Sequence, residues 1–183
     1  MKLNFSVFGP YTIPTLPHDI DEIDKKELNS THWAQWDAEA GLALSTALGC
    51  YILSISGKHP VPWYVGKTEV GFKKECFNPK NLRAFEGVLR KNGKGNPQIT
   101  LIVNVTPGGK LVKPSKNDHS QIDFLENYLI ATCLRKNPDL CNSARTRFVR
   151  GVSVPGLLNP KRGKPSESAK SLAKLVGSDL LIG

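Results

Sequence analysis

Several patterns that would classify a protein at once are absent from this sequence. The four cysteines form no C-x-x-C pair and the four histidines form no H-x-x-x-H pair, which argues against a zinc site. The chain opens without a basic segment followed by an apolar one, so we expect no signal peptide, and scattered thiols are then typical of a cytoplasmic protein. No run reaches the roughly 18 apolar residues that cross a bilayer, and we expect no membrane partner. A phosphate-binding loop of the G-x-x-x-x-G-K-S/T type is also absent.

Acidic residues are scarce outside the first quarter of the chain. Asp and Glu total 16 against 25 Lys and Arg, which gives a net charge of +9 over 183 residues. Residues 1–48 carry 3 basic and 7 acidic side chains (net −4), residues 49–140 carry 14 and 7 (net +7), and residues 141–183 carry 8 and 2 (net +6). Such a basic body and tail suit a polyanion, because bound cations release the counterions condensed on nucleic acid phosphates. A soluble protein of high isoelectric point is the alternative that charge alone leaves open.

Hydrophobic spacing and turn residues predict an α+β domain, a small sheet covered by helices. The expected strands are 2–8, 50–56, 63–68 and 98–105, and the expected helices are 32–47, 72–77, 80–91, 119–136 and 168–176. The second and third strands form an antiparallel hairpin. We expect Gly9-Pro10 to end the first strand and residues 14–30 to form an exposed connector.

A carboxylate interrupts the apolar face of the strongest predicted helix. At about 100° per residue, Glu126 falls about 40° from Ile122, within the stripe that includes Ile130 at about 80°. A carboxylate there is partly removed from water and needs a cation or a hydrogen-bond donor. A structural salt bridge satisfies that need, and so does a role as metal ligand or general base.

Two tyrosines are the second unusual feature. Tyr51 shares its strand face with Leu53, and Tyr64 stands on the returning strand of the hairpin, so the two phenols could lie close together. Gly66 follows Tyr64 closely and, having no Cβ, allows another group to approach the strand. Ordinary packing of strand aromatics is the alternative interpretation.

The motif G-C-Y at 49–51, followed after a hairpin by Y-V-G at 64–66, resembles the paired motif of the GIY-YIG nuclease superfamily. Further similarities follow in the family's order: F-K-K-E at 72–75, Glu126 on the later helix, and Asn142 shortly after that helix. The resemblance implies a small three-stranded antiparallel sheet flanked by helices. It also implies an N-terminal extension, a nuclease domain and a basic C-terminal extension, at residues 1–48, 49–142 and 143–183.

By this resemblance, catalytic side chains stand at Tyr51, Tyr64, Lys74, Glu126 and Asn142. Tyr51 would help to deprotonate the attacking water and Tyr64 would orient water or phosphate. Glu126 would bind Mg²⁺ or Mn²⁺, which stabilises charge on the phosphate and the leaving oxygen. The family has an arginine where Lys74 stands, and lysine keeps the charge but lacks the planar two-pronged donor.

The remaining candidate residues would bind the substrate backbone. Gly66 allows close approach, Lys67 directly follows Y-V-G, and Arg83 is the nearest replacement for the family's arginine. Lys67 and Arg83 could equally be solvated surface residues. The basic tail would contact phosphates through Arg145, Arg147, Arg150, Lys161, Arg162 and Lys164.

The resemblance therefore implies a divalent-metal-dependent endonuclease acting on double-stranded DNA, in a restriction, defence, mobile-element or repair setting. The catalytic part is small, so the flanks, a homodimer or a partner protein would supply target choice. The alternative is a nuclease-derived module that binds nucleic acid with reduced or no cleavage. An enzyme acting on a small molecule has less support, because the sequence lacks a phosphate-binding loop.

Overall fold

The computed structural model describes residues 4–16, 19–92, 95–112, 119–142, 146, 151, 153–155 and 164–176. The chain divides into two compact units, residues 1–142 and 143–183. The first unit contains β1 (Asn4–Thr12), β2 (Thr15–Leu16), β3 (Asp19–Ile23), α1 (Lys25–Glu27), η1 (Leu28–His32), α2 (Trp33–Ala40), η2 (Leu44–Thr46), β4 (Gly49–Ile55), β5 (Val61–Thr68), α3 (Phe72–Glu75), α4 (Pro79–Asn92), β6 (Pro97–Val105) and α5 (His119–Lys136). The second contains α7 (Glu167–Leu175).

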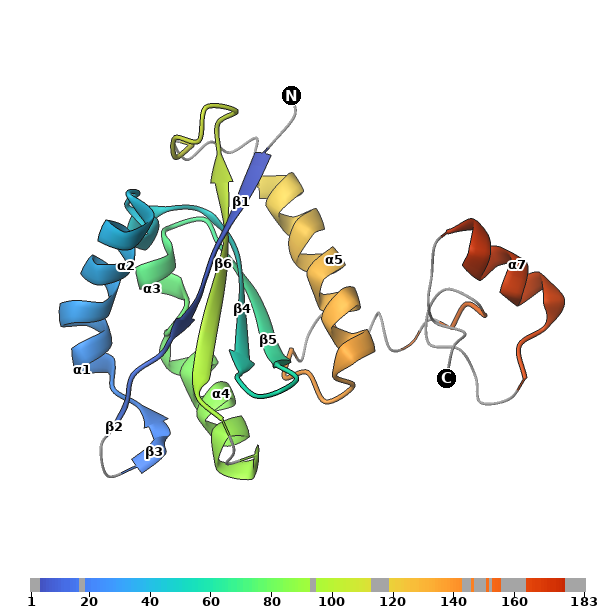
Figure 1. The fold of residues 1–183 in the computed structure, drawn as a ribbon, viewed down its shortest axis with the longest axis horizontal. Helices are drawn as coiled ribbons and strands as arrows, with labels where there is room; N and C mark the ends of the chain where they lie inside the picture. The colour runs from blue at the N-terminus through green and yellow to red at the C-terminus, as the bar shows by residue number, and fades with distance from the viewer. Residues whose placement is uncertain are drawn as a thin grey trace. The chain divides into compact units, whose positions relative to one another are not determined.

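The main sheet confirms the expected α+β class, with four antiparallel strands in the order β1-β6-β4-β5 instead of three. The additional strand is β1, which pairs with β6 from Asn4↔Val105 to Thr12↔Gln98. Part of the predicted N-terminal extension thus belongs to the sheet, because β1 satisfies the free edge of β6. Figure 1 shows α5 on one side of the sheet, with α2, α3 and α4 on the other.

The expectation that Gly9-Pro10 ends the first strand is wrong. β1 continues to Thr12, and the pairing shifts register between Phe8 and Tyr11, which is a bulge. Gly9 adopts a φ of +92°, and a Cβ there would lie 2.8 Å from the carbonyl oxygen of Ile99. The glycine therefore allows the strand to bend while it stays paired.

The predicted helix 32–47 ends earlier than its apolar spacing indicates. Gly41 has a φ of +63° and ends α2 in the left-handed conformation, after which the chain forms the short η2. The expected exposed connector is wrong in part, since it contains the β2–β3 hairpin. It also buries Ile23 and Leu28 against the core.

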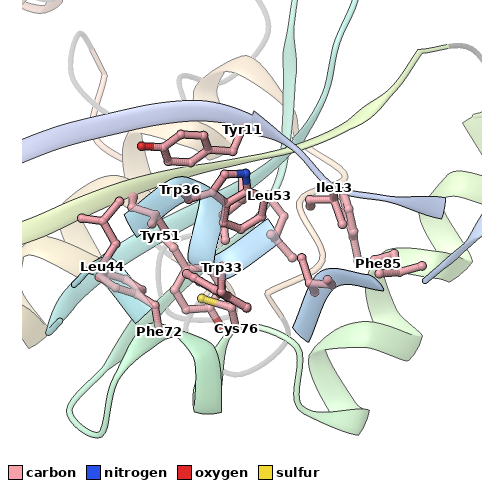
Figure 2. Packing of buried hydrophobic residues seen from close by; sticks show 14 of the residues in the cluster. Tyr11, Ile13, Trp33, Trp36, Leu44, Tyr51, Leu53, Phe72, Cys76 and Phe85 are labelled. Carbon is pink, nitrogen blue, oxygen red and sulfur yellow. The ribbon is translucent and has the colours of Figure 1, made fainter. Parts of the chain in front are cut away.

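The other predicted elements of the first unit are confirmed within a few residues, including the β4–β5 hairpin, β6 and α5. Two apolar clusters lie on opposite faces of the sheet. The larger joins Trp33, Trp36, Tyr51 and Phe72 with other residues under α2, α3 and α4 (Figure 2). The smaller lies under α5 around Ile122. None of the helices in the described part of the chain combines the length and apolar character needed to span a membrane.

Candidate active site

The tyrosine pair lies where the β4–β5 hairpin predicts. Tyr51 is paired with Gly66 and Leu53 with Tyr64, so both phenol rings project from the same face of two adjacent antiparallel strands. Their ring centroids are 6.0 Å apart. The prediction that the two rings share a face is confirmed. The expectation that both hydroxyls open on a concave surface is wrong for Tyr51, which has 0% exposure, whereas Tyr64 is partly exposed.

The glycine of Y-V-G is required by the packing of Tyr51. A Cβ at residue 66 would lie 2.3 Å from Cζ of Tyr51 and 2.4 Å from its hydroxyl oxygen. Because carbon atoms normally approach to about 3.5–4.0 Å, the ring of Tyr51 occupies the space that any other side chain would need. Gly66 therefore contributes to the site by leaving room for Tyr51, which is a different role from admitting substrate.

Asn81 joins the two tyrosines. The Tyr64 hydroxyl donates to Oδ1 of Asn81 (2.9 Å), and Nδ2 of Asn81 donates to the Tyr51 hydroxyl (2.8 Å) and to the carbonyl oxygen of Glu75 (3.2 Å). Asn81 is 4% exposed and its backbone N–H binds Oδ1 of Asn78, at the start of α4. The sequence analysis missed Asn81. Its signal was available, since Asn81 lies four residues before the buried Phe85 and so falls on the apolar face of α4.

Burial controls the ionisation of both phenols. It raises the pKa of Tyr51 well above its usual value, with further contributions from Cys76 and Tyr64. For Tyr64, burial and the negative charge of Glu126 raise the pKa to about 12, although the hydrogen bond with Tyr51 acts in the opposite direction. Both hydroxyls are therefore protonated at neutral pH.

Two carboxylates act on the Tyr64 hydroxyl. Glu126, 8% exposed on α5, makes the larger contribution to its pKa, and Glu75 at the end of α3 makes a smaller one. The position of Glu126 on the buried stripe of α5 is confirmed by its neighbours Ile122 and Ile130, which are both 0% exposed. Glu75 was not identified from the sequence.

The donor set fits a metal that keeps most of its water. Among the described residues, no group of three or more His, Cys, Asp or Glu side chains could enclose an ion. Mg²⁺ is usually held by one or two carboxylates, with water and phosphate oxygens completing its octahedral shell. Glu126, with Glu75 acting on the same hydroxyl, meets that requirement, whereas a dedicated protein cage is not formed by the residues described.

Lys67 is held by carboxylates. Its ammonium group forms ion pairs with Glu69 and, at 2.7 Å, with Asp123 of α5. Burial lowers the pKa of Lys67, but hydrogen bonds to Asp123 and Glu69 outweigh it, so the pKa is raised overall. Lys67 thus ties β5 to α5, and a phosphate would have to compete with two carboxylates for it.

The predicted basic residue of α3 lies on the surface. Lys74 is exposed and, with Lys73 and Val70, lines a cavity of about 550 Å³ that also includes Asn29, Ser45 and Thr46. Arg83 is exposed on α4. The structure therefore places Lys74 beside residues of the N-terminal segment, and the structural contacts described above for the two tyrosines do not include it.

Asn142 has a structural partner next to the tyrosines. Its Oδ1 accepts a hydrogen bond of 2.9 Å from the backbone N–H of Val65, and its Nδ2 donates to the Val65 carbonyl oxygen. Nearby, the Cys141 N–H binds the carbonyl oxygen of Trp63 and the Asn137 side chain binds that of Pro62. Because β5 is an edge strand, these bonds cover backbone groups that would otherwise be unpaired.

Most of the predicted basic tail lies outside the described residues. This applies to Arg145, Arg147, Arg150, Lys161 and Arg162. Lys164 is described and is exposed, shortly before α7, a helix that confirms the one predicted at 168–176.

The chain matches no known family model, and searches of curated proteins and of solved structures find no significant match.

Proposed function

We propose that this chain is a divalent-metal-dependent endonuclease that hydrolyses phosphodiester bonds, with double-stranded DNA as its substrate. The observation that carries this proposal is the Tyr51–Tyr64 pair, packed over Gly66 and placed within the electrostatic reach of Glu126. Nothing in ordinary packing requires a buried carboxylate to act on a phenol. The net charge of +9 supports a polyanionic substrate.

In this proposal residues 49–142 form the catalytic part and residues 1–48 complete its sheet and core. Glu126, with Glu75 nearby, would hold Mg²⁺ or Mn²⁺, which supplies charge stabilisation to the phosphate and the leaving oxygen when bound. The oxygen of a water molecule attacks phosphorus, the bond from phosphorus to the leaving oxygen breaks, and the water proton passes to solvent or to that oxygen. The tyrosines orient the water, since their phenols are protonated at neutral pH.

A nuclease-derived module that binds nucleic acid without cleavage is the second candidate. Two observations favour it: Tyr51 is fully buried with a strongly raised pKa, and an exposed Lys74 stands in place of the family's arginine. A phosphate can still be held by lysine as a point charge, which suffices for binding. The two candidates share the same surface and differ in whether a bond is broken.

Incubation with supercoiled and linear DNA in Mg²⁺, Mn²⁺ or EDTA tests the proposal. We expect metal-dependent nicking by the natural protein. Glu126→Gln preserves shape and removes the charge, so it should abolish nicking while DNA binding and melting temperature change little. Glu167→Gln, at an exposed position of α7, is the matched control and should cut normally.

The outcomes separate the candidates. DNA binding without nicking in any metal would support the binding module. A Glu126→Gln protein that still cuts would refute the metal-ligand role. One that mainly unfolds would identify Glu126 as half of a buried ion pair, whose disruption costs about 3–5 kcal/mol.

A further inference from the structure

Within the proposed active site, the geometry points to Asn81 as a positioning residue and to Tyr64, instead of Tyr51, as the phenol that contacts the reacting water. This inference rests on the proposed function and reassigns the roles that the family resemblance implies. It follows from the direction of three hydrogen bonds and from the burial of the two rings.

The orientation of the Asn81 amide is fixed by the backbone. The carbonyl oxygen of Glu75 can only accept a hydrogen bond, so the amide nitrogen of Asn81 must face it. Tyr51 then has to accept from that same nitrogen, and Tyr64 has to donate its proton to Oδ1 of Asn81. The direction of the proton on Tyr64 is therefore determined by a residue outside the expected motif.

The remaining proton closes the network. The two hydroxyls are themselves hydrogen-bonded, and because the proton of Tyr64 is directed to Asn81, the proton between the phenols comes from Tyr51. Tyr51, Tyr64 and Asn81 thus form a ring in which each side chain donates one bond to the next. A phenol oxygen has two acceptor sites, so the Tyr64 oxygen retains one site after it accepts from Tyr51.

Burial decides which phenol can use its free site. Tyr51 has 0% exposure and lies beneath Gly66, whereas Tyr64 is partly exposed and under the influence of Glu126. A water molecule near that carboxylate can donate a hydrogen bond to Tyr64. Tyr51 and Asn81 hold the Tyr64 hydroxyl with its acceptor site turned away from the ring, which orients the water.

Single-turnover cleavage and DNA affinity, measured for four variants, test these roles. Tyr64→Phe should slow cleavage by at least about 100-fold, the scale of a positioned group at a reacting centre. Tyr51→Phe should slow it by less than about 10-fold, the scale of one neutral hydrogen bond. Asn81→Leu should slow it by about 10-fold or more with unchanged DNA affinity. Tyr128→Phe, at an exposed position of α5, is the control and should be unchanged.

The reverse order, with Tyr51→Phe inactive and Tyr64→Phe active, would overturn the inference. So would an Asn81→Leu protein with unaltered cleavage. If Asn81→Leu fails to fold, the comparison between the two Tyr→Phe variants still decides which phenol contacts the water.

A second measurement does not require nuclease activity. N-acetylimidazole acetylates accessible phenols, and peptide mass spectrometry locates the product. In the folded natural protein we expect Tyr128 to react first, Tyr64 more slowly and Tyr51 least, and we expect Asn81→Leu to increase the rate at Tyr64. Acetylation of Tyr51 as fast as Tyr64 would overturn the inference. If the natural protein cuts no DNA but shows the expected order, the proposed function fails and the hydrogen-bonded arrangement stands.

Discussion

Replacement of Gly66 by alanine tests whether Tyr51 is packed on the hairpin as described. The new Cβ would lie 2.3, 2.4 and 2.6 Å from three atoms of the Tyr51 phenol. The ring cannot move freely, since Phe72 and Tyr64 contact it with centroids at 6.3 and 6.0 Å and Asn81 binds its hydroxyl. Overpacking of this kind costs about 1–3 kcal/mol, and the contacts here place Gly66→Ala at the upper end.

Urea unfolding followed by circular dichroism measures this change. A loss of about 3 kcal/mol corresponds to a fall of roughly 6–12 °C in melting temperature for a chain of this size. Gly87→Ala is the matched control, because a Cβ at this position of α4 meets nothing within 4 Å. It should stabilise the protein by up to about 1 kcal/mol through helix propensity.

A double variant isolates the clash. Tyr51→Leu removes the atoms that the new Cβ would meet, so the loss from Gly66→Ala should be at least about 1 kcal/mol smaller in the Tyr51→Leu background. Additive losses, or a Gly66→Ala protein as stable as the natural one, would refute the packing of Tyr51 over Gly66.

Three further predictions concern stability. Asn104 is 1% exposed and its side-chain amide finds no hydrogen-bond partner within the described ranges, so Asn104→Leu should raise the free energy of unfolding by up to about 1–3 kcal/mol in urea; a decrease would refute this. Asn142→Ala removes two bonds to the β5 edge and should lower it by about 1–3 kcal/mol, with a loss below experimental error as the contrary result. The pKa of Tyr64 is raised in the folded state, so its contribution to stability is present below about pH 10 and is lost as the pH rises towards about 12. Urea titrations of Tyr64→Phe should therefore show a smaller decline in that window than the natural protein.

Local patterns predicted most of the elements correctly because the information for them is local. The α5 helix has a long apolar stripe and ends before Asn137-Pro138, and the β4–β5 hairpin has two β-rich runs around a turn, so both were identified from the sequence. The pairing of β1 with β6 joins residues about a hundred positions apart, and no local signal reports such a contact. Gly41 was missed because apolar spacing continues past it to Leu44 and Ala47, although the helix itself does not.

The candidate site was less predictable than the fold, because its members come from different faces of the sheet. Tyr51 and Tyr64 project toward α3 and α4, while α5 packs on the opposite face, where Cys50 and Ile122 meet. Glu126 nevertheless acts on Tyr64, and this is possible because β5 is the last strand of the sheet. A further strand beside β5 would separate the carboxylate from the phenol. The edge position of β5 is therefore a requirement of the site, and the bonds from Asn142 and Cys141 show how backbone exposed at that edge is satisfied.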